Sequence, residues 1–211
     1  MSSGDTGFEQ NAAKSAPTST MGMQLSFETV LQRVCEAEGV VVIVMGAAGA
    51  GKSTVGAALA AALGWPFIDA DAFHTADNIA RMRAGTGLTD EDRGPWLTRV
   101  RDAIRDLSAQ PVVVACSALK RSYREALTDG VRHARFVYLQ ADEALLRERL
   151  MNRRGHFAGA ALAATQLHDL EAPGDDALIV DASLPPDVLV GQIRRALQLG
   201  AERPEELRTK D

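Results

Sequence analysis

Residues 40–53 read VVVIVMGAAGAGKS, and the fold class can be predicted from them. Its first six residues are apolar without polar alternation, which is typical of a strand buried on both faces of a parallel sheet. A glycine-rich turn follows. Residues 52–63 then place apolar side chains along one stripe of a helix, and Gly64 is positioned to end it. The sequence therefore predicts a strand, a tight loop and a helix in succession.

The same alternation continues along the chain. Further strands are expected at residues 65–68, 111–115, 135–139 and 177–180, and further helices at 96–107, 119–127, 143–151 and 186–199. The segment 78–97 is too polar to predict a packed helix by itself. Strands that alternate with helices in this way predict an α/β fold, with a doubly wound parallel sheet covered by helices on both faces.

Length and composition limit the possible classes of protein. A chain of 211 residues with 46% hydrophobic residues suits one α/β domain. The net charge of −5 argues against a nucleic-acid-binding protein, and no apolar run is long enough to predict a membrane span. Cys35 and Cys116 lack the spacing of a zinc site or a disulfide framework, so a reducing compartment, the cytoplasm, is expected.

The two ends of the chain differ in composition from the part between them. Residues 1–24 are small and polar and predict a flexible leader, and the charged residues 201–211 predict a flexible tail. One domain is expected between them, at residues 25–200.

The segment from Gly46 to Ser53 matches the P-loop pattern G-x-x-x-x-G-K-[ST]. Glycines let the backbone wrap a phosphate so that N–H groups point inward, and the helix N-terminus adds partial positive charge. Lys52 is expected to reach the β- and γ-phosphates, and the Ser53 hydroxyl is expected to bind Mg²⁺. The predicted nucleotide-binding residues are Gly46, Ala47, Ala48, Gly49, Ala50, Gly51, Lys52, Ser53 and Thr54. A turn that merely joins strand to helix is the alternative.

Two carboxylates, Asp69 and Asp71, follow the second predicted strand. Open α/β sheets bind their ligands at this edge. One carboxylate can hold Mg²⁺, and the other can accept the proton of an attacking hydroxyl. The alternative is that Asp71 caps the helix that follows. The third strand ends at Cys116 without an acidic residue, so Mg²⁺ must depend on Ser53 and this aspartate pair.

Basic residues are expected to gather at the same edge. Arg81 and Arg93 flank a capped turn that begins at Thr89, and Lys120 and Arg124 share one helix face. A solvated helix face is the alternative for the second pair, and Trp96 is expected in the core.

A run of arginines at 147–154 leads into Gly155-His156-Phe157. Arginines on a glycine-hinged segment suit a lid at about residues 152–165 that closes over the triphosphate and stabilises transition-state charge. The alternative is a solvated basic helix.

With these blocks assembled, the chain resembles the gluconokinase family from about residue 40 to residue 199. The resemblance rests on GAAGAGKS at 46–53, DADAFH at 69–74, NIARMRAGTGLTDEDRGPWL at 78–97, CSALKRSYR at 116–124, RRGHF at 153–157 and TQLHDLEAP at 165–173. It departs from the family at Gly87, where proline is common, at Ala158, where methionine or phenylalanine is, and at Leu167, where phenylalanine is.

The resemblance implies a P-loop NTPase of the nucleoside-monophosphate-kinase type, a three-layer α/β/α fold with a five-stranded parallel sheet in the order 2-3-1-4-5 and a lid. It implies Lys52, Asp71 and Arg153 as catalytic residues, Asp71 being the candidate base, with Asp69 and Ser53 at the metal and Arg149 at the nucleotide. It places His74, Arg81, Arg93, Lys120, Arg124 and His156, together with Asp71, around the substrate.

The activity that this resemblance implies is transfer of phosphate from Mg·ATP to the 6-hydroxyl of D-gluconate, and the family suggests a homodimer. Two alternatives stay open. One is a kinase of another small hydroxy acid, like shikimate kinase. The other is a nucleotide-dependent switch, although the chain has neither an acidic residue after its third strand nor an NKxD motif.

Overall fold

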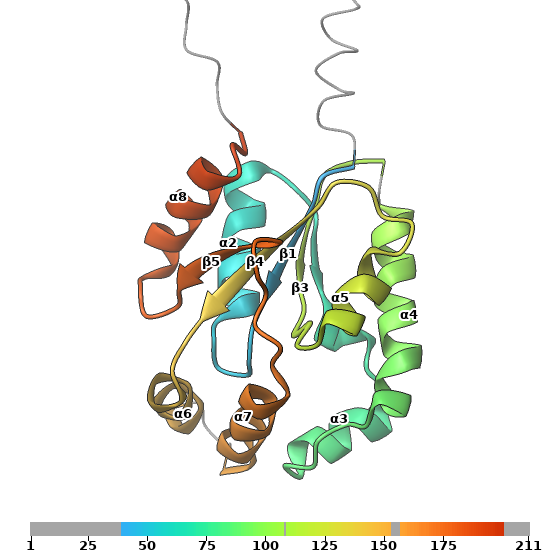
Figure 1. The fold of residues 1–211 in the computed structure, drawn as a ribbon, viewed down its shortest axis with the longest axis vertical. Helices are drawn as coiled ribbons and strands as arrows, with labels where there is room; N and C mark the ends of the chain where they lie inside the picture. The colour runs from blue at the N-terminus through green and yellow to red at the C-terminus, as the bar shows by residue number, and fades with distance from the viewer. Residues whose placement is uncertain (1–38, 108, 153–156, 201–211) are drawn as a thin grey trace, which may run out of the picture.

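A computed structural model describes residues 39–107, 109–152 and 157–200 of this chain. A five-stranded parallel sheet in the order β2-β3-β1-β4-β5 forms its centre (Figure 1). The strands are β1 (Val41–Met45), β2 (Phe67–Asp69), β3 (Val112–Ala115), β4 (Ala134–Gln140) and β5 (Ala177–Asp181). The predicted fold class and strand order are confirmed.

The fully buried strand β1 separates two hydrophobic cores. Because successive side chains point to opposite faces of a sheet, Val42 and Val44 enter one core, while Val41, Ile43 and Met45 enter the other. This alternation explains why the strand has no polar position: both of its faces are covered.

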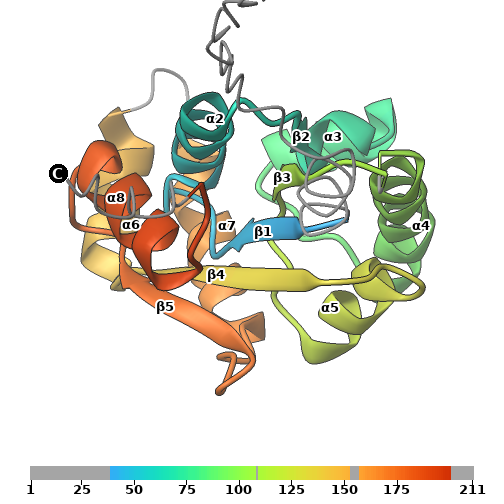
Figure 2. The ribbon, with the colours of Figure 1, turned by 90° about the horizontal axis from the view of Figure 1, so that it is seen from above.

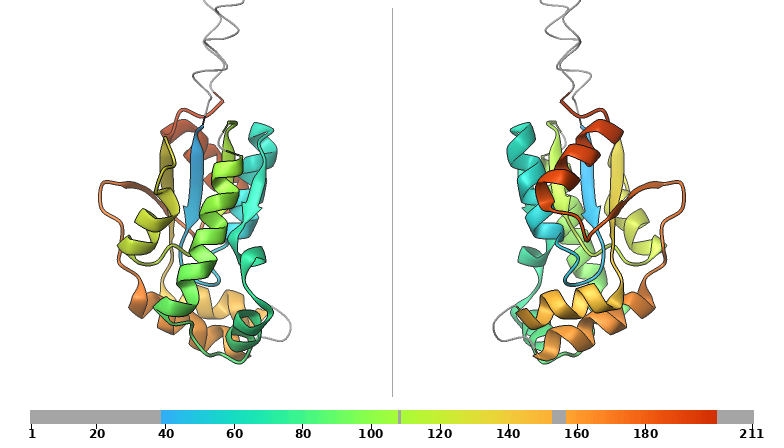
Figure 3. Two further views of the ribbon diagram at one scale, coloured as in Figure 1. Left: turned by 90° about the vertical axis from the view of Figure 1, so that its right-hand side faces the viewer. Right: turned by 90° about the vertical axis from the view of Figure 1, so that its left-hand side faces the viewer.

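Helices cover both faces of the sheet and one of its ends (Figures 2 and 3). Helices α2 (Lys52–Leu63) and α8 (Pro186–Ala196) pack on one face, and α4 (Asp90–Asp106) and α5 (Arg121–Thr128) on the other. The helices α3 (Ala76–Arg83), α6 (Glu143–Asn152) and α7 (Phe157–Asp169) lie beyond the carboxyl ends of the strands, at the lower end of Figure 1. No helix within the described ranges is long and apolar enough to cross a membrane.

Local signals fix the ends of α2 as predicted. Gly51 precedes the helix with a φ of 97°, and Gly64 ends it with a φ of 69°. These left-handed conformations favour glycine because it has no Cβ. The Gly64 N–H donates to the carbonyls of Ala60 and Ala61, and the Trp65 N–H also donates to Ala60, so these carbonyls of the last turn are satisfied.

The polar segment 78–97 is more helical than its composition predicts. It contributes to α3 and to the start of α4, which begins at Asp90 rather than at residue 96. A capping box explains the early start: the Thr89 hydroxyl accepts the Asp92 N–H, and the Asp92 carboxylate accepts the Thr89 N–H at 2.9 Å. Local hydrogen bonds therefore replace apolar burial as the support for this first turn.

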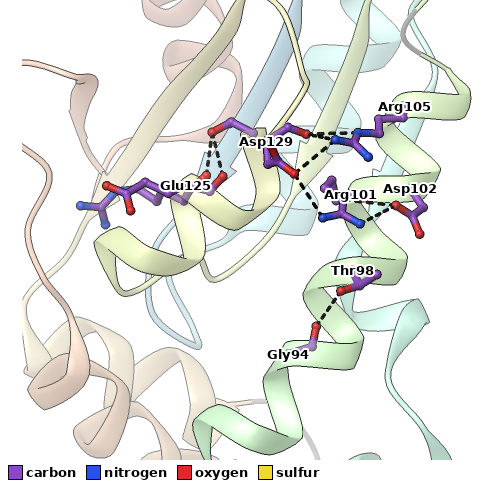
Figure 4. Close-up of polar contacts among 9 residues, drawn as sticks. Gly94, Thr98, Arg101, Asp102, Arg105, Glu125 and Asp129 are labelled. Atoms are coloured by element: carbon purple, nitrogen blue, oxygen red, sulfur yellow. Dashed lines mark hydrogen bonds and ion pairs between the residues drawn. The ribbon is translucent and has the colours of Figure 1, made fainter.

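A polar clamp ties α4 to the end of α5 (Figure 4). Arg101 donates to the Asp129 carboxylate at 3.4 Å, and Arg105 donates to both its backbone carbonyl and its carboxylate. A Cβ on the neighbouring Gly130, whose φ is 70°, would lie 2.4 Å from Arg105. The clamp thus holds together the two helices that carry several candidate substrate-binding residues.

The predicted leader at 1–24, tail at 201–211 and most of the proposed hinge before α7 lie outside the described residues. The domain boundaries at 25–200 and the lid at about 152–165 stay predictions.

Candidate active site

The register of the sheet brings the glycine-rich loop and the aspartate pair to one edge. Ala115 of β3 is aligned with Val44 of β1 on one side and with Asp69 of β2 on the other. Asp69 therefore lies level with Val44, two residues before Gly46, where the loop begins. Because all of these strands are parallel, both segments leave the sheet at its carboxyl edge.

The loop itself has the strained geometry that its glycines predict. Gly46 and Gly49 have φ values of 144° and 88°, and a Cβ on Gly46 would lie 2.9 Å from the Leu139 carbonyl oxygen. Inside the loop, the Lys52 ammonium donates to the Ala47 carbonyl at 3.0 Å. Lys52 is thus folded along the loop, with its charge beside the backbone N–H groups that would receive a phosphate.

Asp69, not Asp71, caps the short 3-10 helix η1 (Ala70–Phe73): its Oδ1 accepts the Asp71 N–H at 3.0 Å. Thr75 caps the next helix, α3. The alternative that Asp71 serves as a helix cap is therefore wrong, and its exposed carboxylate is left for another role.

The charges that act on Cys116, just past β3, come from both the loop and the aspartate pair. Burial raises the pKa of the Cys116 thiol to about 12; the charges of Asp71 and Asp69 add to the rise, and Lys52 opposes it. All three charged groups thus act on one buried atom at the sheet edge. The same pKa makes Cys116 an inert thiol, as predicted, rather than a nucleophile.

The donors available for a metal ion suit magnesium rather than zinc. Within the described ranges, no three His, Cys, Asp or Glu side chains gather into a metal cluster. Ser53, in the first turn of α2, and Asp69, with one carboxylate oxygen engaged by Asp71, offer hard oxygen donors. Mg²⁺ typically takes one or two such ligands and completes its shell with water and phosphate oxygens, so these residues fit it.

A second group of polar residues joins the start of α4 to the start of α5. The Asp90 carboxylate accepts hydrogen bonds from the Lys120 ammonium at 2.8 and 2.9 Å and from the Tyr123 hydroxyl. These two hydrogen bonds lower the pKa of Asp90, while the bond to Asp90 raises the pKa of Lys120. Sequence reasoning placed Lys120 in the site but missed Asp90 and Tyr123, although each lies in one of the motifs that carry the family resemblance.

Arg93 is buried and held in place by its neighbours. Its side chain is 6% exposed, its Nε donates to the Leu88 carbonyl at 3.2 Å, and its guanidinium lies 5.4 Å from the centre of the Tyr123 ring. Among the described residues, none accepts a hydrogen bond from its two terminal nitrogens. A fixed guanidinium with two such nitrogens is a fork that fits a carboxylate.

By contrast, Arg81 is already paired. Its Nη1 lies 2.6 Å from the Asp92 carboxylate, which also accepts two hydrogen bonds from Thr89. The bonds to Thr89, followed by burial acting against them and by the charge of Arg81, set the pKa of Asp92 below its ordinary value. Arg81 thus supports the start of α4 in this structure.

His74 stacks on Trp96, with ring centroids 4.4 Å apart and an interplanar angle of 11°. Trp96 is buried as predicted, and its indole N–H donates to the Ala70 carbonyl at 2.7 Å. Burial lowers the pKa of His74, and its buried Nδ1 has no hydrogen-bond partner within the described part of the chain. The stack holds the imidazole next to the end of η1.

Arg124 is buried in the scaffold rather than solvated. Its side chain is 4% exposed, and its Nη1 donates to the carbonyls of Ala118, Leu119 and Glu171 at 3.1 to 3.3 Å. The alternative of a solvated helix face is therefore wrong for Arg124. Its predicted contact with substrate stays untested.

Arg149 connects the glycine-rich loop to the residue that follows β5. It donates to the Ala50 carbonyl at 3.3 Å and to the Ala182 carbonyl at 2.7 Å, and it lines a cleft of about 300 Å³ together with Thr54 and Leu189. Arg147, two residues earlier in α6, forms an exposed pair with Glu143 instead. The candidate residues Arg153 and His156 lie outside the described residues.

Comparison with known proteins identifies relatives of the whole folded part. The profile of the shikimate kinase family matches residues 48–170. A gluconokinase of Gluconobacter oxydans (strain 621H) is 42% identical over 160 residues, which are 74% of this chain and 90% of the relative. Among solved structures, a sugar kinase from Janibacter sp. HTCC2649 is 36% identical with a TM-score of 0.72, covering 76% of this chain and 95% of that one. A gluconokinase from Sinorhizobium meliloti 1021 is 39% identical with a TM-score of 0.65, covering 79% and 99%.

Proposed function

This chain has a shikimate kinase-family domain and belongs to the gluconokinases, and from that membership we propose that it transfers the terminal phosphate of ATP to the 6-hydroxyl of D-gluconate. The observation that carries the proposal is the shared sheet edge: the phosphate-binding loop follows β1, and the exposed carboxylate of Asp71 follows β2, on the two sides of the parallel strand β3. A nucleotide phosphate and an acceptor hydroxyl can meet there.

The reaction requires one bond to form and one to break. The gluconate O6 attacks the γ-phosphorus, its proton passes to the Asp71 carboxylate, and the bond between that phosphorus and the β–γ bridging oxygen breaks to release ADP. Lys52 and the loop N–H groups stabilise the charge on the phosphate oxygens. Ser53 and Asp69 would hold Mg²⁺, which adds positive charge against those oxygens when bound. Arg153 is proposed to contribute from the lid.

Arg93 is our candidate for the gluconate carboxylate. Its cation is buried and oriented, yet its terminal nitrogens are uncommitted among the described residues. Lys120 and Arg81 each have an aspartate partner, and Arg124 is bonded to three carbonyls. His74, Lys120 and Tyr123 would then surround the hydroxyl groups, for which they offer donors and acceptors.

The cleft beside Arg149 is proposed to hold the base of the nucleotide. It adjoins the loop through Gly49 and Gly51 and is bounded on its other side by Leu184, Pro186 and Leu189. An apolar wall with a guanidinium on one side suits a flat heterocycle.

A coupled assay of ADP release tests the proposal. With purified protein, Mg²⁺ and ATP, D-gluconate should accelerate ADP release many-fold, and the product should be 6-phospho-D-gluconate by mass spectrometry. Shikimate at the same concentration should give no acceleration. A rate that gluconate leaves unchanged would reject the assignment, and a preference for shikimate would favour the other hydroxy-acid reading.

We also propose that the enzyme is a homodimer and works in the cytoplasm, where ATP and a sugar acid are available. Light scattering coupled to size-exclusion chromatography checks the first point, with a mass of one 22.5 kDa chain contradicting it.

A further inference from the structure

Helix α7 contributes a side chain to the phosphate-binding loop. The amide oxygen of Gln166 accepts the backbone N–H of Ala48 at 2.7 Å, across 118 positions of sequence. This N–H lies in the middle of the loop, a segment whose backbone amides are the typical donors to nucleotide phosphates in this motif. Neither the P-loop pattern nor the predicted site residues include Gln166.

The packing of α7 holds this residue in place. Ala163 is fully buried in the core that also contains Ala47 and Ala50, and Leu167 packs against the same core. Residues 163, 166 and 167 are spaced i, i+3 and i+4, so they share one face of the helix. The contact is therefore part of a packed face, and it joins the loop to the helix that follows the predicted lid.

The chemistry of the contact determines which way the amide points. Since a backbone N–H can only donate, Gln166 must present its Oε1 to Ala48. The Nε2 group then carries two N–H donors at the loop, and none of the described residues accepts from it. An uncommitted donor beside a phosphate-binding loop suits a phosphate oxygen.

We propose that Gln166 is a further residue of the phosphate site: its Oε1 positions Ala48, and its Nε2 donates to the terminal phosphate of the nucleotide. The proposal deepens the kinase function and rests on nucleotide binding at this loop. It gives α7 the means to distinguish ATP from ADP, because only ATP carries the group that Nε2 would contact.

The decisive variant is Gln166→Glu, which keeps an acceptor for Ala48 but replaces the donor with a negative charge. We expect its Kd for a non-hydrolysable ATP analogue to rise about 10- to 100-fold, the worth of one hydrogen bond to a charged group. Its Kd for ADP should change no more than about threefold. Calorimetric titration of both nucleotides into the full chain measures the two values.

Gln166→Met removes acceptor and donor together while keeping a similar volume. We expect its kcat/KM for ATP to fall at least as far, with the KM for gluconate unchanged within about threefold. His168→Glu is the matched control, because it adds a negative charge to the exposed side of the same helix. It should resemble the wild type in both nucleotide affinities. Urea unfolding of each variant verifies that the fold is retained.

Two outcomes would overturn the proposal. One is Gln166→Glu weakening ADP as much as the ATP analogue, which would make the contact purely structural. The other is Gln166→Met keeping its kcat/KM for ATP within threefold of the wild type. The nucleotide titrations need no gluconate, so they remain informative even if the wild type fails to phosphorylate gluconate.

Discussion

At the scale of single residues, Asp71 and Arg93 divide the expected work on the substrate. Asp71 has an exposed carboxylate in η1, just past the carboxyl end of β2, and Arg93 has a buried guanidinium whose Nε donates to the Leu88 carbonyl. One group is placed to take a proton and the other to hold an anion. Their substitutions should therefore affect different kinetic constants.

Asp71→Asn should lower kcat about 10²- to 10⁴-fold, the usual contribution of a general base, because an amide cannot accept the O6 proton. The Kd for ATP should stay within a few-fold. Steady-state kinetics and nucleotide titration measure both. Asp77→Asn, an exposed aspartate in the first turn of α3, is the control. An unchanged kcat would remove Asp71 from its proposed role.

Arg93→Lys should raise the KM for gluconate at least about tenfold, because lysine keeps the charge but loses the two-pronged geometry and the bond to Leu88. The KM for ATP should hardly change. Arg147→Lys offers a matched control, since that arginine is exposed and pairs with Glu143 of its own helix. If Arg93→Lys and Arg147→Lys bind gluconate equally well, another cation holds the carboxylate.

At the scale of elements, Arg124 links α5 to two loops of the site. Its Nη1 serves the carbonyls of residues 118 and 119, which lead into α5, and that of Glu171, which follows α7. The Arg121 N–H donates to the Glu171 carboxylate at 2.6 Å and reinforces the same junction. The buried arginine therefore acts as a structural support for both segments.

Arg124→Met should lower the free energy of unfolding by roughly 2–4 kcal/mol, because three carbonyls lose a charged donor in a buried setting. Urea denaturation gives the value. Arg121→Met on the same helix is the control, since the bond of Arg121 to Glu171 uses its backbone N–H and its side chain is exposed. A loss of gluconate affinity in Arg124→Met without loss of stability would instead support direct contact with substrate.

The same scale shows what a sequence can predict. The strand at 40–45 is predicted from its unbroken apolar run, which is typical of a strand buried on both faces. Helix α2 is predicted from its apolar stripe and the glycine that ends it. The capped turn at Thr89 is predicted, but the helix is expected to begin only at residue 96, because apolar periodicity is absent from the first turn that the capping box stabilises. The pairing of Asp90 with Lys120 and Tyr123, and the reach of Gln166 to Ala48, join segments that only the fold brings together.

At the scale of the whole molecule, two kinds of shifted group make stability depend on pH. Burial lowers the pKa of His74 below its ordinary value of 6.5; Asp71 opposes this shift, and Arg93 and Arg99 add to it. Hydrogen bonds lower the pKa values of Asp90 and Asp92 below their ordinary value of 3.8. In each case the unfolded chain takes up protons at a higher pH than the folded protein does.

The free energy of unfolding should therefore be constant in its His74 contribution above about pH 7.5 and fall as the pH drops through 6.5. A second decline should begin as the pH approaches 3.8, when the aspartates of the unfolded chain become protonated first. Urea denaturation at a series of pH values measures both. In His74→Gln the first decline should be reduced while the second persists, because the stack on Trp96 then carries no titrating group. An equally steep fall between pH 7 and pH 5 in this variant would mean that another group controls that range.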